Sequence, residues 1–203
     1  MANPLDETSA RDPENLGPIW IDKREVAARQ IAAAILMFFE GQDPVATHSV
    51  VAAAHQILID LGAREDVHSI VKGPKAQRDR HARLNFAANF FKHADRDADG
   101  RINIAPLKEL TAEFLMDSVY LLQRSSQRLP LEAKIYWHWF VKTRPELFEG
   151  SGPELDLMIA AEFSTKPDEL AQLVRLIWAV GEDRIGEFLD AVSGISRPDA
   201  AQS

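Results

Sequence analysis

The stretch "REVAARQIAAAILMFFEGQDPVATHSVVAAAHQILIDLG", Arg24 to Gly62, decides the fold class. Its apolar residues recur at helical spacing on both sides of a short polar break. Asp22, just before the stretch, and Glu25 are expected to form a capping box that begins the first helix, and Gly41 ends it. Asp43 and Pro44 begin the second helix, and Gly62 is expected just past its end. Two capped helices joined by so few residues predict an antiparallel helical hairpin.

The rest of the chain shows the same helical periodicity. Further helices are expected near 76–94, 106–124, 130–144, 153–163, 167–180 and 182–193, and no alternating β-branched run predicts a strand. We therefore expect an all-α bundle of about seven or eight helices. A single helical domain is expected over 19–194, between a disordered lead at 1–18 and a flexible tail at 195–203.

The composition excludes several classes of protein. The 203 residues are 46% hydrophobic and 27% charged, which is typical of a soluble globular chain, and none is cysteine. Disulfide partners and thiolate metal sites are therefore excluded. The longest apolar run, Ile31–Phe39, is nine residues, far below the roughly 20 that span a bilayer. With no signal peptide and no dinucleotide, phosphate-loop or serine-hydrolase motif, the sequence predicts a cytoplasmic protein with no membrane contact and no cofactor.

Charge is distributed unevenly. The net charge of −8 argues against a whole surface built to bind nucleic acid. From Lys72 to Arg101, however, the chain has eight basic and four acidic residues, so this segment has a net charge of +4 and the remainder a net charge of −12. The basic segment is either a solvated helix face with internal salt bridges or a local binding surface.

The helix expected at 76–94 carries a polar stripe. At 100° per residue, six of its polar residues fall within about 80° of one another, and His93 flanks them. Such a set of amides, cations and imidazoles can bind phosphate, and an imidazole can move a proton. The apolar remainder predicts deep packing with only the stripe exposed. The alternative is a buried helix whose asparagines bond backbone groups and whose charges lie at its ends. The candidate ligand-binding residues are Arg78, His81, Asn85, Lys92 and Arg96, and the candidate catalytic residues are Asn89 and His93.

The segment after this helix has the opening of an EF-hand loop. Asp95, Asp97, Asp99 and Gly100 follow the D-x-D-x-D-G order. Position 12 of such a loop supplies a bidentate glutamate, and here it is Pro106, which has no side-chain oxygen. The carboxylates are therefore expected to cap and turn the chain, and a calcium-binding helical module remains an alternative.

Two further features are assigned to the core. His48 and His55 lie seven residues apart, whereas paired metal ligands on a helix prefer a spacing of three or four, so both are expected to be partly buried core residues. The aromatic run "YWHWF" at Tyr136–Phe140 could stack bases. A buried helix is the favoured interpretation of this run.

The opening hairpin, together with "ANFFKH" at 88–93, resembles HEPN domains, the all-helical nucleotide- and RNA-associated superfamily of prokaryotic defence systems. The resemblance covers roughly residues 23–94. In that family an R-N-x-x-x-H motif converges at a dimer interface and cleaves RNA. Asn89 matches the polar residue and His93 the histidine, but Ala88 stands where the arginine should be. The phrase "NFFKHADRD" is also similar to a group of uncharacterised bacterial proteins.

The missing arginine decides which function is expected first. A guanidinium would stabilise the charge that develops on phosphorus, and Ala88 leaves that role empty. We therefore expect a non-catalytic, HEPN-like module that binds RNA or a nucleotide through the polar stripe and forms a homodimer. The alternatives are a metal-independent endoribonuclease with His93 as acid and base, and the calcium-binding module of Asp95, Asp97 and Asp99.

Overall fold

The structure, a computed structural model, describes residues 18–62, 86–93, 98–125, 129–148, 163–181 and 184. Every regular element in these ranges is helical, which confirms the all-α class for this part of the chain. The elements are α1 (Lys23–Phe39), α2 (Pro44–Gly62), α4 (Leu107–Ser125), α5 (Leu131–Thr143), the short 3₁₀ helix η2 (Pro145–Leu147) and α7 (Pro167–Val180). Residues 86–92 are also helical.

The first helix begins where the sequence predicts. Asp22 Oδ1 accepts a hydrogen bond from the Glu25 backbone N–H at 2.8 Å, which satisfies one of the free amides of the first turn. The expected capping box is only half present, because the Glu25 carboxylate accepts from Arg29 Nε at 2.7 Å one turn later. The start of α1 thus depends on Asp22.

Four residues, 40–43, join α1 to α2. Gly41 has a φ of 64°, a left-handed conformation that glycine adopts without strain and that ends α1. Asp43 Oδ1 then accepts from the Ala46 backbone N–H at 2.9 Å and begins α2. Gly62 was expected just beyond α2, and it is instead the last residue of that helix.

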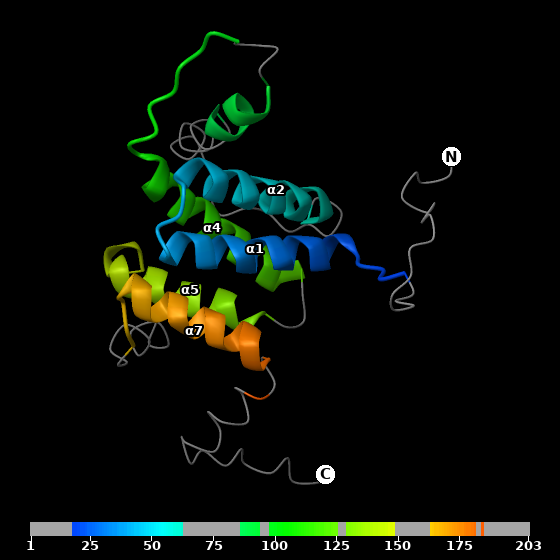
Figure 1. Cartoon of the computed structure of the whole chain (residues 1–203), viewed down its shortest axis with the longest axis vertical. Coiled ribbons are helices and arrows are strands. Elements are labelled where there is room, and N and C mark those ends of the chain that lie inside the picture. Colours follow the sequence, from blue (N-terminus) through cyan, green and yellow to red (C-terminus); the bar gives the residue numbers. More distant parts are fainter. Residues whose placement is uncertain are drawn as a thin grey trace.

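The α1 helix is central to the described part of the protein. It packs against α2 and α4 on one side and against α5 and α7 on the other (Figure 1). The most extensive helix contacts join α2 to α4 and α1 to α2. Small residues such as Ala27 and Ala34, both fully buried, allow this close approach, and Ile31 and Ile35 fill the space between helices.

An aromatic cluster fills the junction of α1 and α5. The rings of Phe38 and Phe39 lie 5.2 Å and 5.6 Å from that of Trp139, and both also contact Tyr136. The Tyr136 hydroxyl donates to the Ala112 carbonyl at 2.7 Å, and burial raises the pKa of this phenol well above its usual value. The expected burial of the aromatic run is confirmed for Tyr136, Trp139 and Phe140, whereas Trp137 and His138 are half-buried.

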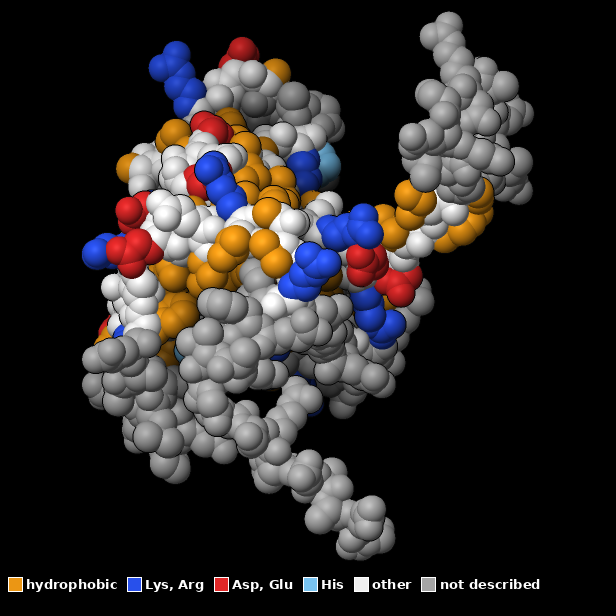
Figure 2. Space-filling model, turned by 60° about the horizontal axis from the view of Figure 1, so that its bottom comes forward, with side chains coloured by type: hydrophobic (Ala, Val, Ile, Leu, Met, Phe, Trp, Pro, Cys, Tyr) orange, Lys and Arg blue, Asp and Glu red, His pale blue; other side chains and the backbone are white. Residues whose placement is uncertain are grey.

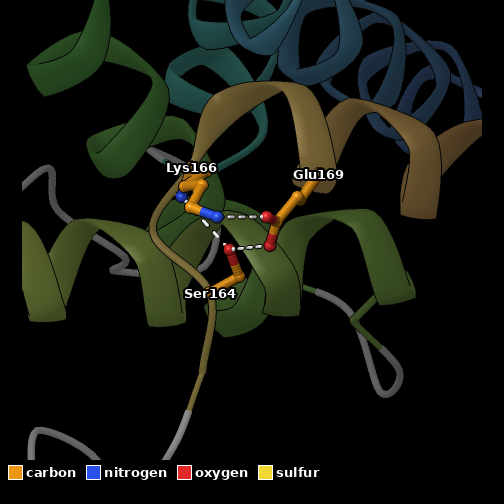
Figure 3. A network of polar contacts seen from close by, with 3 residues as sticks. All are labelled: Ser164, Lys166 and Glu169. Carbon is orange, nitrogen blue, oxygen red and sulfur yellow. Dashed lines mark hydrogen bonds and ion pairs between the residues drawn. The ribbon is translucent and has the colours of Figure 1, made fainter.

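The beginning of α7 is held by an exposed network (Figure 3). Lys166 Nζ and the Ser164 hydroxyl each donate to the Glu169 carboxylate, both at 2.6 Å. The bond from Lys166 lowers the pKa of Glu169, and the same bond raises the pKa of Lys166. Because these groups are solvated, the network orients the first turn and contributes little to stability.

Some expectations fall outside the described residues. These are the lead at 1–17, the tail at 195–203, and almost all of the helices predicted near 153–163 and 182–193. The first ten residues of the helix expected at 76–94 also lie outside. Among the helices that the structure describes, none is both long and apolar enough to cross a bilayer.

Candidate functional site

The helical segment 86–92 presents one face outward and one inward. Ala87 and Ala88 are buried, with exposures of 2% and 6%, while Asn89 and Lys92 are exposed. His93, directly after the helix, is half-buried, and its backbone N–H donates to the Asn89 carbonyl at 3.1 Å. The helical bond places these two residues one turn apart on the same side. We call Asn89, Lys92 and His93 the polar face.

Only part of the predicted stripe can be placed. Asn89 and Lys92 are exposed as expected, and the structure brings His93 beside them. The remaining stripe residues lie outside the described ranges, namely Arg78, His81, Asn85 and Arg96. The polar face is therefore the described portion of the candidate site.

The prediction of deep packing around this stripe is wrong at Phe86. Its side chain is 58% exposed, and the neighbouring Phe90 is half-buried with its ring centroid 6.4 Å from that of Phe86. Phe91 is also half-buried and lies edge-on to His48 at 6.1 Å. The core thus covers the side of the helix that carries Ala87, Ala88 and Phe91, and the opposite side mixes aromatic and polar groups.

Ala88 belongs to the hydrophobic core. The HEPN resemblance places the catalytic arginine at this position. A guanidinium there would have to enter the packed interior, where an unpaired charge is strongly unfavourable. Ala88 lies one turn before Lys92 but faces the core, and Asn89 and His93 lie on another side of the helix, so an arginine at 88 would have to leave the core to reach His93.

A buried polar pair joins α2 to α4. His55 Nε2 lies 2.6 Å from Asp117 Oδ2, and the two side chains are 3% and 0% exposed. The distance is that of a hydrogen bond, which gives each of these buried polar atoms a partner. Sequence reasoning placed His55 in the core and missed Asp117. The available signal was a single acid within the apolar run "FLMDSVYLL" of α4.

His48 makes a second polar contact between the same helices. Thr111 Oγ donates to the Leu107 carbonyl at 2.6 Å, so it accepts from His48 Nδ1, which lies 3.0 Å away. The ring of Phe114 stacks on His48 and also contacts His55, with centroids 5.5 Å and 4.2 Å apart. Both histidines are fully buried rather than partly buried as expected. They hold α2 against α4 and are closed to ligands.

Metal sites find little support in the described residues. No group of three or more His, Asp or Glu side chains there is arranged to hold an ion. In the EF-hand-like segment, Asp99 is exposed in a turn, and Asp95 and Asp97 lie outside the described ranges. The Pro106 carbonyl accepts from the Leu110 backbone N–H at 3.1 Å, so loop position 12 already belongs to the start of α4.

Two surface hollows lie near the start of α4. One, of about 230 Å³, is lined by residues that include Phe38, Thr47 and Lys108. The other, of about 460 Å³, is largely apolar and lies between the segment 86–87 and the first turn of α4. Neither hollow is lined by the polar face. Asn89 and Lys92 are exposed, which suits an extended ligand more than an enclosed small molecule.

No protein-family model matches the chain, and no curated protein or solved structure resembles it significantly.

Proposed function

We propose that this protein is a non-catalytic, HEPN-like module that binds RNA or a nucleotide through the polar face. The observation that carries the proposal is the contrast between Ala88, which is buried, and Asn89 and Lys92, which are exposed on the same helix. The face offers groups that bind a polyanion. Nothing at the motif's arginine position can stabilise the transition state of RNA cleavage.

Each group of the polar face has a distinct use. The Lys92 ammonium binds phosphate as a point charge, and the Asn89 amide donates and accepts at a base edge or ribose. The half-buried Phe90 ring follows Asn89 in the chain and supplies a surface on which a base can stack. The sequence segment 72–101, which contains the polar face, is +4 in a chain of −8, and this local excess of positive charge favours a polyanion.

The proposal includes the finer architecture expected from the sequence. The bundle has seven or eight helices and opens with an antiparallel hairpin, which is supported by the four-residue link between α1 and α2 and by the way these helices pack. A cytoplasmic location is also proposed, since a chain without cysteine suits a reducing compartment.

The test is binding of a fluorescently labelled single-stranded RNA, measured by anisotropy in EDTA at several salt concentrations. Lys92→Ala should weaken binding to RNA of every sequence. It should also reduce the slope of the logarithm of the association constant against the logarithm of the salt concentration by about 0.7, the value for one phosphate contact on a single strand. Asn89→Ala should weaken binding while the melting temperature stays unchanged. Lys134→Ala, an exposed lysine on α5, is the matched control and should leave both quantities unchanged.

Two results would contradict the proposal. Binding that is equally sensitive to Lys92→Ala and Lys134→Ala would show an unspecific charge effect. Robust RNA cleavage in EDTA that is lost in His93→Ala would favour the endoribonuclease, with His93 as acid and base.

A further inference from the structure

The smaller of the two hollows near the start of α4 is built from two distant parts of the sequence. The last turn of α1, the link to α2 and the first turn of α2 form one wall, and residues 104–111 form the other. Figure 1 shows the link and the start of α4 at the same end of the helices. Because α1, α2 and α4 pack against one another, both walls belong to one packed unit. The fold itself therefore forms the hollow.

The apolar part of this hollow limits the size of what it can hold. Phe38, which is 7% exposed, lines it together with Pro44 and Ile104. The volume is about 230 Å³. An apolar cavity of about 150 Å³ holds benzene, and sites for drug-sized ligands begin near about 300 Å³. The hollow is thus suited to a single ring or a short branched chain.

The charged group of the hollow is Lys108. Its Nζ lies 6.0 Å from the centroid of the Phe38 ring. Among the described residues no carboxylate is paired with this ammonium and no acidic side chain lines the hollow, and Glu40 in the link is paired with Arg175 instead. Figure 2 shows Lys and Arg side chains next to hydrophobic ones on one face of the molecule. Such a combination is what a small anion with an apolar body requires.

Two buried threonines decide which end of such an anion lies inside. Thr47 and Thr111 line the hollow and are 3% and 1% exposed. Their hydroxyl protons are already used, because Thr47 Oγ1 donates to the Asp43 carbonyl at 2.9 Å and Thr111 Oγ1 to the Leu107 carbonyl at 2.6 Å. A hydroxyl that has donated its proton can only accept from a further group, so it does not bind an anion. The exposed Lys108 therefore holds the negative end, and the apolar end lies inward.

We propose that the hollow binds a small organic acid, in which one carboxylate is attached to a single ring or a short branched chain. The apolar body contacts Phe38 and Ile104, and the carboxylate forms an ion pair with Lys108. A carboxylate matches the single ammonium, whereas a phosphate monoester carries about two charges and needs further donors. None of Asn89, Lys92 and His93 lines the hollow, so this proposal is independent of RNA binding by the polar face.

Titration of the full chain with phenylacetate, followed by the backbone amide resonances in NMR, tests the proposal. Saturable shifts are expected at 41–47 and 104–111, with a dissociation constant on the order of 1 mM, since the body is small and the ion pair is exposed. Two probes separate the two ends of phenylacetate. 2-Phenylethanol keeps the ring and lacks the charge, so it should bind three- to fivefold more weakly, about the factor that one exposed ion pair supplies. Acetate keeps the charge and lacks the ring, and it should give no saturable shifts.

A charge-removing variant is the decisive arm. Lys108→Met keeps the unbranched stem and should raise the dissociation constant of phenylacetate about three- to fivefold while leaving that of 2-phenylethanol unchanged. Lys134→Met on α5 is the matched control, and it should bind phenylacetate like the wild type, as should Lys92→Ala. Absence of saturable shifts with phenylacetate, equal affinity for the acid and the alcohol, or equal effects of Lys108→Met and Lys134→Met would each overturn the proposal.

Discussion

The buried pair of His55 and Asp117 allows the clearest test of what holds the fold together. Asp117 is fully buried and contacts an imidazole that is 3% exposed, between the two helices with the most extensive contact. Asp117→Ala removes the partner of His55 and leaves a polar ring in the interior. Breaking such a buried pair costs about 3–5 kcal/mol, a large part of the roughly 5–15 kcal/mol that stabilises a typical domain.

Urea unfolding followed by circular dichroism measures this cost. Asp60→Ala is the matched control, because this aspartate of α2 is exposed and accepts a hydrogen bond from the Gln56 side chain on the surface. Its loss should lower the free energy of unfolding by less than about 0.5 kcal/mol. Replacing both buried partners by leucine should recover much of the stability, since an apolar pair needs no polar partner. A cost below about 1 kcal/mol for Asp117→Ala, or no coupling in a double-mutant cycle with His55→Ala, would refute the reasoning.

Three further predictions concern the core and the loop. Ala88→Arg should lower the free energy of unfolding by more than about 2 kcal/mol and should create no ribonuclease activity, because position 88 faces the core. A stable and active variant would contradict the placement of this residue. Burial raises the pKa of Tyr136, so the stability that this phenol contributes is fully present below about pH 10 and is lost progressively as the pH rises above it. The free energy of unfolding should therefore fall in alkali. Tyr136→Phe should flatten that fall and should cost about 1 kcal/mol at neutral pH. Calorimetry should show calcium binding no tighter than millimolar, since Pro106 replaces the bidentate ligand, and a micromolar dissociation constant would show that the loop closes in another way.

Local chemistry made much of the described fold predictable. The Asp22 and Asp43 caps and the left-handed Gly41 are decided within a few residues, and the helices begin and end close to the expected positions. The same holds for α4 and α5, whose starts follow Pro106 and Pro130.

The site was less predictable because it depends on contacts between distant segments. Helical periodicity predicts how polar and apolar residues are arranged around the helix at 86–92. It does not predict that the core covers Ala88 and leaves Phe86 exposed. Likewise, Asp117 is 62 residues from His55, and their pairing depends on how α4 is aligned against α2. A single sequence does not encode that alignment in any local pattern.

The central claim, that the polar face is the binding surface, is tested most directly by mapping RNA onto the protein. Backbone amide resonances of the full chain would be followed by NMR as a short single-stranded RNA is added in EDTA. We expect the largest shifts in the described part of the chain to lie at 86–93, centred on Asn89 and Lys92, and we expect Lys92→Ala to need a higher RNA concentration to reach the same shifts. Shifts centred on α5 and α7, or no saturable shifts at all, would contradict it.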